Sequence, residues 1–236
     1  MTVGAIILAA GLSRRMGANK LSADLGGKPV LAHMIDAVEA AGLPMLVSIP
    51  PRGEEGDREA VEGAGGRAQR AESFQLETSY SSRDFAHGEP PPISSGWSPS
   101  SCREGMVIVP DHALGMGHSI AAAIRAVPAN WTAALICLGD MPFVTPATLK
   151  ALAGAAREDR VVAPIHDGQR GNPLVWGRSF FPDLAQLRGD TGGRSLLKDM
   201  GGRFVLLPVD DPGILIDIDT PEALAEAQSR SARCSR

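Results

Sequence analysis

Short apolar runs alternate with longer amphipathic segments along much of the chain. The first run, from Val3 to Ala10, is continuous and mostly apolar, which is typical of a parallel strand buried on both faces. Pro29 then opens a segment with apolar residues at helical spacing, and Gly42 ends it. A second apolar run, from Met45 to Ile49, predicts the next strand.

The same alternation resumes after residue 105. The further strands that it predicts are Met106–Val109, Ala133–Leu138, Val161–Ala163, Leu174–Val175, Phe204–Leu207 and Leu215–Ile218. The further helices are His118–Val127, Pro146–Ala156, Ser195–Met200 and one that Pro221 opens. Repetition of strands and helices in this order predicts an α/β fold with a mostly parallel central sheet and helices on both faces.

Residues 52–104 interrupt this pattern. Between positions 51 and 104, Gly (7), Pro (5) and Ser (9) together fill 21 of 54 places, and Val61, Leu76 and Ile93 are the only residues of the Val, Leu, Ile and Met set. Few core residues are available there to offset the entropy of ordering the segment. We therefore predict a single domain over residues 1–236 with a flexible insert at 52–104, in which one helix fits near Glu54–Glu62. A partner-binding role for the insert is the alternative.

Composition and charge narrow the class of protein. Among the 236 residues, acidic side chains exceed basic ones by 27 to 23, which argues against a nucleic-acid-coating protein. No apolar run approaches the roughly 20 residues that span a bilayer, and we expect no signal peptide. The three cysteines, Cys102, Cys137 and Cys234, are too far apart for a disulfide framework or a metal motif. A cytoplasmic protein with reduced thiols is expected.

The loop after the first strand is the strongest candidate site. Between positions 12 and 28, Arg14, Arg15, Lys20 and Lys28 stand against Asp24, so this loop is locally positive in an acidic chain. Small residues before it let backbone approach a ligand, and the cations suit phosphate. The loop matches neither the GxGxxG fingerprint nor a P-loop. A tight turn with solvated cations is the structural alternative.

Two carboxylates at predicted strand ends suggest a metal site. Asp140 follows the apolar run that ends at Leu138, and Asp217 ends the run from Leu215. Carboxylates at the carboxyl ends of parallel strands suit Mg²⁺ that bridges to phosphates. The alternative is that each Asp caps a following turn or helix. Thr220, directly before Pro221, is predicted to be the N-cap of the last helix.

Six segments in a fixed order resemble the nucleotidyltransferases that act in molybdenum cofactor synthesis, and most closely their cytidylyltransferase branch. The segments are LAAGLSRRMGANKL from Leu8, GMGHSI from Gly115, LGDMPF from Leu138, GQRGNP from Gly168, GDTGGR from Gly189 and DIDTP from Asp217. The resemblance covers residues 3–50 and 105–227. It implies a Rossmann-like nucleotidyltransferase fold and Mg²⁺-dependent transfer of a nucleotide from a nucleoside triphosphate to a phosphorylated pterin acceptor.

The resemblance also implies roles for individual residues. The nucleotide-binding set is Leu8, Ala9, Ala10, Gly11, Arg15, Lys20, Gly117, Ser119 and Asp140. The acceptor-binding set is Arg170, Gly171, Asn172, Pro173, Asp190, Gly192 and Arg194. Arg15, Lys20 and Asp140 take the catalytic roles, and Asp140 with Asp217 holds Mg²⁺. Within the family an Ala-Ala-Gly turn accompanies CTP, so Ala9 to Gly11 favours CTP over GTP.

The hypothesis that follows is an in-line displacement that makes a cytidylated molybdopterin and releases pyrophosphate. A molybdoenzyme that receives the product is a further partner in this interpretation. Two alternatives stay open: a nucleotidyltransferase for another small phosphorylated acceptor, such as a sugar or alcohol phosphate, and a non-catalytic chaperone that delivers molybdenum cofactor. Asn172, where relatives often have His, departs from the family pattern at the acceptor segment.

Overall fold

The computed structural model describes residues 1–10, 20–51, 105–190, 192–198 and 200–234. The predicted insert at 52–104, with its helix, and the site residues Gly11 and Arg15 lie outside the described residues.

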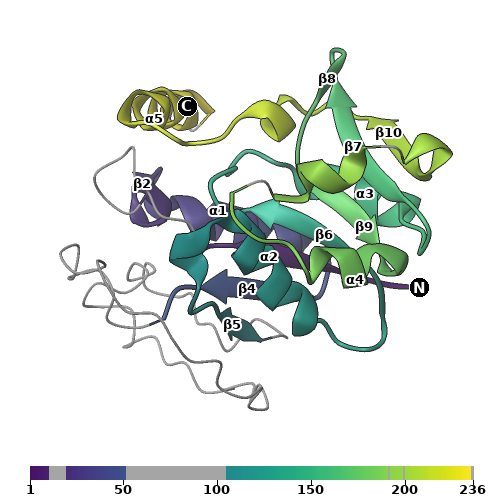
Figure 1. The fold of residues 1–236 in the computed structure, drawn as a ribbon. Helices are drawn as coiled ribbons and strands as arrows, with labels where there is room; N and C mark the ends of the chain where they lie inside the picture. The colour runs from purple at the N-terminus through teal and green to yellow at the C-terminus, as the bar shows by residue number, and fades with distance from the viewer. Residues whose placement is uncertain (11–19, 52–104, 191, 199, 235–236) are drawn as a thin grey trace.

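A mostly parallel sheet forms the centre of the molecule (Figure 1), as predicted. Its main path runs β10-β7-β9-β6-β1-β4-β5. The strands are β1 (Thr2–Leu8), β4 (Met45–Ile49), β5 (Met106–Ile108), β6 (Trp131–Leu138), β7 (Val161–His166), β9 (Leu174–Gly177) and β10 (Phe204–Pro208). Neighbours pair in parallel except at β9, which is antiparallel to both β6 and β7. The short strand β8 (Gln169–Arg170) pairs with the end of β7, and β2 (Asp24–Leu25) and β3 (Lys28–Pro29) form a separate hairpin.

Helices cover both faces of this sheet. Helices α1 (Val30–Ala40) and α3 (Pro146–Ala155) pack on one face, and α2 (Met116–Arg125) and α4 (Phe181–Leu184) pack on the other. The 3₁₀ turns are η1 (Lys20–Ser22), η3 (His112–Leu114), η4 (Arg178–Phe180), η5 (Gly192–Leu197), η6 (Gly201–Arg203) and η7 (Pro212–Leu215). None of the helices in the described ranges is long and apolar enough to cross a membrane.

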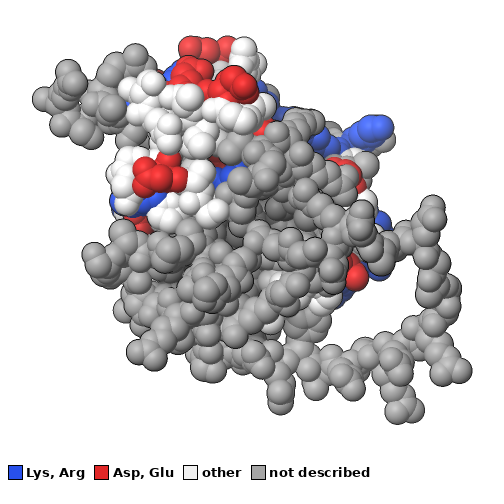
Figure 2. Space-filling model, turned by 90° about the vertical axis from the view of Figure 1, so that its left-hand side faces the viewer, with Lys and Arg blue, Asp and Glu red and all other residues white. Residues whose placement is uncertain are grey.

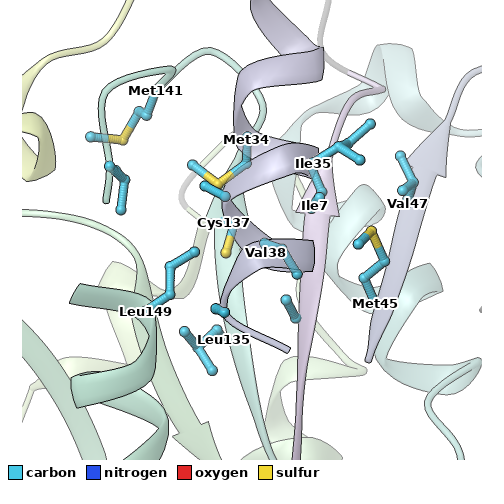
Figure 3. Packing of buried hydrophobic residues seen from close by; sticks show 14 of the residues in the cluster. Ile7, Met34, Ile35, Val38, Met45, Val47, Leu135, Cys137, Met141 and Leu149 are labelled. Carbon is cyan, nitrogen blue, oxygen red and sulfur yellow. The ribbon is translucent and has the colours of Figure 1, made fainter. Parts of the chain in front are cut away.

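The core explains why the first strand is apolar without interruption. In β1, Ile7 faces the cluster under α1, whereas Ile6 faces the cluster under α2, and both are fully buried. Figure 3 shows Met34 and Val38 of α1 packed over the strands of the first cluster. Cys137 lies within this cluster, and burial raises the pKa of its thiol to about 12, so it acts as a small apolar side chain.

The C-terminal helix α5 (Pro221–Cys234) lies beside the β2–β3 hairpin, away from the two main layers (Figure 1). A small third cluster joins them, formed by Leu25, Val30, Ile218 and Ala227. The face seen in Figure 2 carries acidic side chains at the height of α5, which contributes the exposed residues Glu222 and Glu226. Through the third cluster, helix α5 is packed against the hairpin segment that follows Lys20.

Two predicted elements differ from the structure. Residues 215–218 do not form a strand, because Asp211 caps the turn η7 at Pro212 and the chain leaves the sheet there. The apolar residues of that run, Ile214 and Ile218, are buried at other places, outside the sheet. The predicted helix Ser195–Met200 is instead a 3₁₀ segment, η5, that begins at Gly192.

Candidate active site

The carboxyl ends of the central strands hold the predicted nucleotide segment. Leu8 ends β1, and its carbonyl accepts a hydrogen bond from Gly139 N–H at 3.1 Å, just beyond β6. Ala9 N–H donates to the carbonyl of Ser48 in β4 at 3.0 Å. Leu8, Ala9 and Ala10 are all buried. The backbone that leads into the predicted phosphate-binding loop is therefore tied to both neighbouring strands.

Three charged side chains from distant parts of the chain meet at this edge. The Lys20 ammonium donates to Asp140 Oδ2 and, at 2.5 Å, to Asp219 Oδ1. The side chains of Lys20 and Asp140 are 14% and 15% exposed, whereas Asp219 is 40% exposed. Lys20 thus bridges one deep and one shallower carboxylate, and two residues of the predicted nucleotide-binding set, Lys20 and Asp140, lie in direct contact.

Burial and charge act against each other in this cluster. Burial raises the pKa of Asp140, the Lys20 ammonium lowers it in part, and the nearby Asp219 and Asp217 raise it again, so the net pKa lies above the usual range of Asp. Burial lowers the pKa of Lys20, but Asp140 and Asp219 outweigh it and the net pKa is raised. Lys20 therefore carries its positive charge throughout the neutral range.

One oxygen of this cluster suits a cation. Asp140 Oδ1 is buried and accepts no hydrogen bond from any part of the chain that the structure describes. A buried carboxylate oxygen without a partner is costly, and a divalent cation would satisfy it. Asp217 is exposed and acts on Asp140 through its charge, without a direct contact to Lys20. Over the described ranges, no group of three or more His, Cys, Asp or Glu side chains is arranged as a metal centre.

Capping does not explain Asp140, because its Oδ2 accepts from Lys20 and its Oδ1 accepts no hydrogen bond within the described chain. No helix follows Asp140 directly, since α3 begins at Pro146 with Thr145 as its N-cap. Thr220 caps α5, as predicted, because its hydroxyl accepts from Ala223 N–H at 3.2 Å. The segment before it is held by a bond from Ile218 N–H to the carbonyl of Asp140 at 2.9 Å.

A second meeting point joins the predicted nucleotide and acceptor segments. Gly117, in the first turn of α2, donates to the carbonyl of Gly189 at 2.8 Å. Gly189 N–H in turn donates to His118 Nδ1 at 3.3 Å. Asp190 lies directly beside Gly115, so the GMGHS and RGD segments form one unit. Ser119 is buried within α2.

The other predicted acceptor residues are spread more widely. Gly171 donates to the carbonyl of Pro164 and Asn172 to that of Ile214, both at 3.0 Å, and the Asn172–Pro173 peptide is cis. The guanidinium of Arg170 lies over the ring of Phe204, 5.7 Å from its centroid. Gly192 is buried and Arg194 exposed in η5. Within the part of the chain that the structure describes, no hydrogen bond or ion pair joins these residues to the cluster of Lys20, Asp140 and Asp219. A separate hollow at the ends of β7 and β10 contains none of the predicted site residues.

Asp211 is a residue that the sequence analysis missed. Its side chain is only 3% exposed, and its oxygens accept four hydrogen bonds. The donors are Thr145 N–H at 2.9 Å, the Thr145 hydroxyl at 2.9 Å, the Thr148 hydroxyl at 2.6 Å and Gly213 N–H at 2.9 Å. Asp211 thus ties the start of α3 to η7, which leads into Asp217 and Asp219.

We expect Asp211→Asn to destabilise the fold by about 2–4 kcal/mol, because its amide group would face donors that now bond a carboxylate. Urea unfolding at neutral pH measures this free energy. The matched control is Asp210→Asn, since Asp210 is the exposed neighbour, and there the change should stay within about 0.5 kcal/mol. Equal effects at both positions would show that the buried network contributes nothing.

Comparison with known proteins decides the family. The profile of the MobA-like NTP transferase domain matches residues 5–83 and 93–205. The chain belongs to this family. Purine catabolism protein PucB of Bacillus subtilis is 29% identical over 194 residues, which cover 82% of this chain and 79% of PucB. The bifunctional protein GlmU of Syntrophomonas wolfei is 25% identical over 75% of this chain, which spans only 31% of GlmU.

Solved structures share the fold of this MobA-like domain. Rv0371c of Mycobacterium tuberculosis aligns with a TM-score of 0.69 at 20% identity, covering 97% of this chain and 98% of that protein. A complex of Rv0371c with manganese aligns at 0.64, 21% identity and 97% and 99% coverage. A molybdopterin-guanine dinucleotide biosynthesis protein A from Archaeoglobus fulgidus aligns at 0.55, 18% identity and 99% and 100% coverage. These matches confirm the predicted nucleotidyltransferase fold.

Proposed function

We propose that this MobA-like protein transfers CMP from CTP to a phosphorylated pterin of the molybdopterin type and releases pyrophosphate. The observation that carries the proposal is the contact between Lys20 and Asp140 at the carboxyl ends of the central strands. A fixed ammonium can offset the charge of a triphosphate, and a buried carboxylate beside it can hold a divalent cation that does the same.

The proposed reaction is an in-line displacement at the α-phosphorus of CTP. An oxygen of the acceptor phosphate attacks the α-phosphorus, the bond from the α-phosphorus to the bridging oxygen breaks, and pyrophosphate leaves. The attacking phosphate is already ionised, so no general base is required. Lys20, together with Arg15, neutralises the charge on the phosphates.

A divalent cation fits the same edge. Asp140 would hold it through Oδ1, with Asp217 as the second predicted ligand, and Mg²⁺ when bound would supply charge neutralisation between the phosphates. The manganese complex of the structural relative Rv0371c is consistent with a divalent cation in proteins of this fold.

The acceptor is proposed from the sequence motifs at residues 170–173 and 189–194. The structure supports this in one respect, since Gly189 and Asp190 lie against the first turn of α2 beside the predicted nucleotide segment. Another small phosphorylated acceptor, such as a sugar or alcohol phosphate, is the alternative. A cofactor chaperone without catalysis is disfavoured because Lys20 and Asp140 are both in place.

Nucleotide choice tests the proposal. With Mg²⁺ and molybdopterin, we expect kcat/KM for CTP to exceed that for GTP by about tenfold or more, measured as pyrophosphate release. Ala10→Gly, which converts the turn to Ala-Gly-Gly, is expected to reduce this preference because Ala10 is buried at the end of β1. A clear preference for GTP in the wild-type protein would overturn the cytidylyl assignment. Release that needs a sugar phosphate instead would overturn the pterin assignment.

A further inference from the structure

Both backbone polar groups of Gly189 are bonded to consecutive residues of helix α2. Its carbonyl accepts from Gly117 N–H at 2.8 Å, and its N–H donates to Nδ1 of the His118 ring at 3.3 Å. Gly189 leads into the predicted acceptor residues, and Gly117 belongs to the predicted nucleotide-binding set, whereas His118 is in neither set. We propose that His118 is a positioning residue, which holds the Gly189 turn in the orientation that binds the acceptor. This inference rests on the proposed function and deepens it.

The turn and the helix meet backbone against backbone. A Cβ at Gly117 would lie 2.9 Å from the carbonyl carbon of Arg188 and 2.9 Å from the carbonyl oxygen of Gly189. Gly189 has φ +65°, in the left-handed region that glycine adopts without strain. Contact between glycines provides no interlocking side chains. The hydrogen bonds therefore fix how the turn lies on the first turn of α2.

Two hydrogen bonds fix an orientation that one bond alone would leave free to rotate. The bond from Gly117 joins two backbones, so it does not depend on the side chain at position 118. The second bond needs His118 Nδ1 as an acceptor, so in the neutral ring the proton is on Nε2. Without this acceptor the Gly189 turn would pivot on a single bond. Asp190, the next residue and a member of the acceptor set, would then lose its fixed place beside Gly115.

Loss of this bond should affect the two substrates unequally. Gly117 and Ser119 belong to α2 itself, so the predicted nucleotide segment keeps its place when the side chain of His118 changes. The turn at Gly189 and Asp190 is the part that would move. In-line attack requires the acceptor phosphate to be aligned with the α-phosphorus, so a loosened turn should weaken productive binding of the acceptor.

Kinetics of His118→Leu test the proposal, with molybdopterin as the acceptor and Mg²⁺ at saturation. We expect KM for molybdopterin to rise about fivefold and KM for CTP to stay within about twofold of the wild-type value, because a single acceptor-side hydrogen bond is lost. Amide hydrogen exchange of the ligand-free protein, followed by NMR, gives a second measurement. Exchange at Gly189 should be at least about threefold faster in His118→Leu.

A conservative variant and a matched control separate positioning from a structural effect. His118→Asn places an amide oxygen the same number of bonds from the backbone as Nδ1, so it should restore both KM for molybdopterin and slow exchange at Gly189. His166 is another half-buried histidine whose Nδ1 bonds a backbone group, the carbonyl of Val209 at 3.1 Å, and it lies outside the predicted site residues. His166→Leu should leave both values at the wild-type level.

Two results overturn the inference. One is a His118→Leu variant in which KM rises equally for CTP and molybdopterin, or for neither. The other is a His118→Asn variant that does not restore KM for molybdopterin.

Hydrogen exchange also separates this inference from the proposed function. If the wild-type protein releases no pyrophosphate from CTP in the presence of molybdopterin, the proposed function fails. The exchange rates then still decide whether His118 holds the turn. Faster exchange at Gly189 in His118→Leu supports this role, and equal exchange in the variant and the wild-type protein overturns it.

Discussion

Asp140→Asn is expected to reduce nucleotidyl transfer by at least about a hundredfold, because the amide keeps the shape of the side chain but removes its charge. Asp140 is the deep partner of Lys20 and has a buried oxygen free for a cation. Turnover as a function of Mg²⁺ concentration measures the effect. Asp217→Asn is expected to weaken turnover less, since Asp217 is exposed and makes no direct contact with Lys20.

The same variant should fold normally, which separates a catalytic role from a structural one. Burial raises the pKa of Asp140, so the ionised side chain is costly in the fold, and a neutral amide avoids that cost while Lys20 keeps Asp219. Asp159→Asn, at an exposed carboxylate in the turn after α3, is the matched control for activity. Normal turnover with normal Mg²⁺ dependence in Asp140→Asn would contradict both the metal assignment and the proposed catalysis.

Gly115→Ala is expected to be the most damaging small substitution at the site. Gly115 has φ +118°, and a Cβ there would lie 2.5 Å from the carbonyl carbon of Gly189 and 2.4 Å from Asp190 Oδ1. Backbone strain and the clash together should cost about 2–6 kcal/mol and separate α2 from residues 188–190. We expect KM for the acceptor to rise and the melting temperature to fall.

Gly154→Ala provides the matched control for this glycine. Gly154 lies in α3, and a Cβ there would meet no atom within 4 Å. Replacing a helical glycine should raise stability by about 0.5–1 kcal/mol and leave turnover unchanged. Thermal unfolding and kinetics of both variants decide the matter. If Gly115→Ala behaves like Gly154→Ala, the contact between α2 and the Gly189 turn is not required.

The sheet could be predicted because its strands follow simple rules of burial. Met45–Ile49 has the predicted bounds, because the short apolar run lies between Gly42, which ends the preceding helix, and two prolines, which end the strand. The approach of Lys20 to Asp140 was also accessible, because parallel strands bring their carboxyl ends to one edge. The antiparallel direction of β9 was not accessible, since a short apolar run does not reveal which way a strand runs.

The missed site residues depend on contacts between distant segments. Asp210 and Asp211 are adjacent and chemically identical, and only the packing of α3 against η7 buries the second one. Asp219 was given no role, because the resemblance supplies one only for Asp217 in the DIDTP segment. The place of Asp219 beside Lys20 is set by how α5 packs on the hairpin, which no local pattern encodes.

The fate of the phosphorus atoms tests the central claim most directly. The protein is mixed with Mg²⁺, molybdopterin and CTP labelled at either the α- or the γ-phosphorus, and the products are separated. Nucleotidyl transfer predicts that the α-label joins the pterin and the γ-label leaves as pyrophosphate. In Lys20→Ala, neither labelled product should form. Recovery of the γ-label as inorganic phosphate, or of unchanged CTP in a tight complex with the protein, would contradict it.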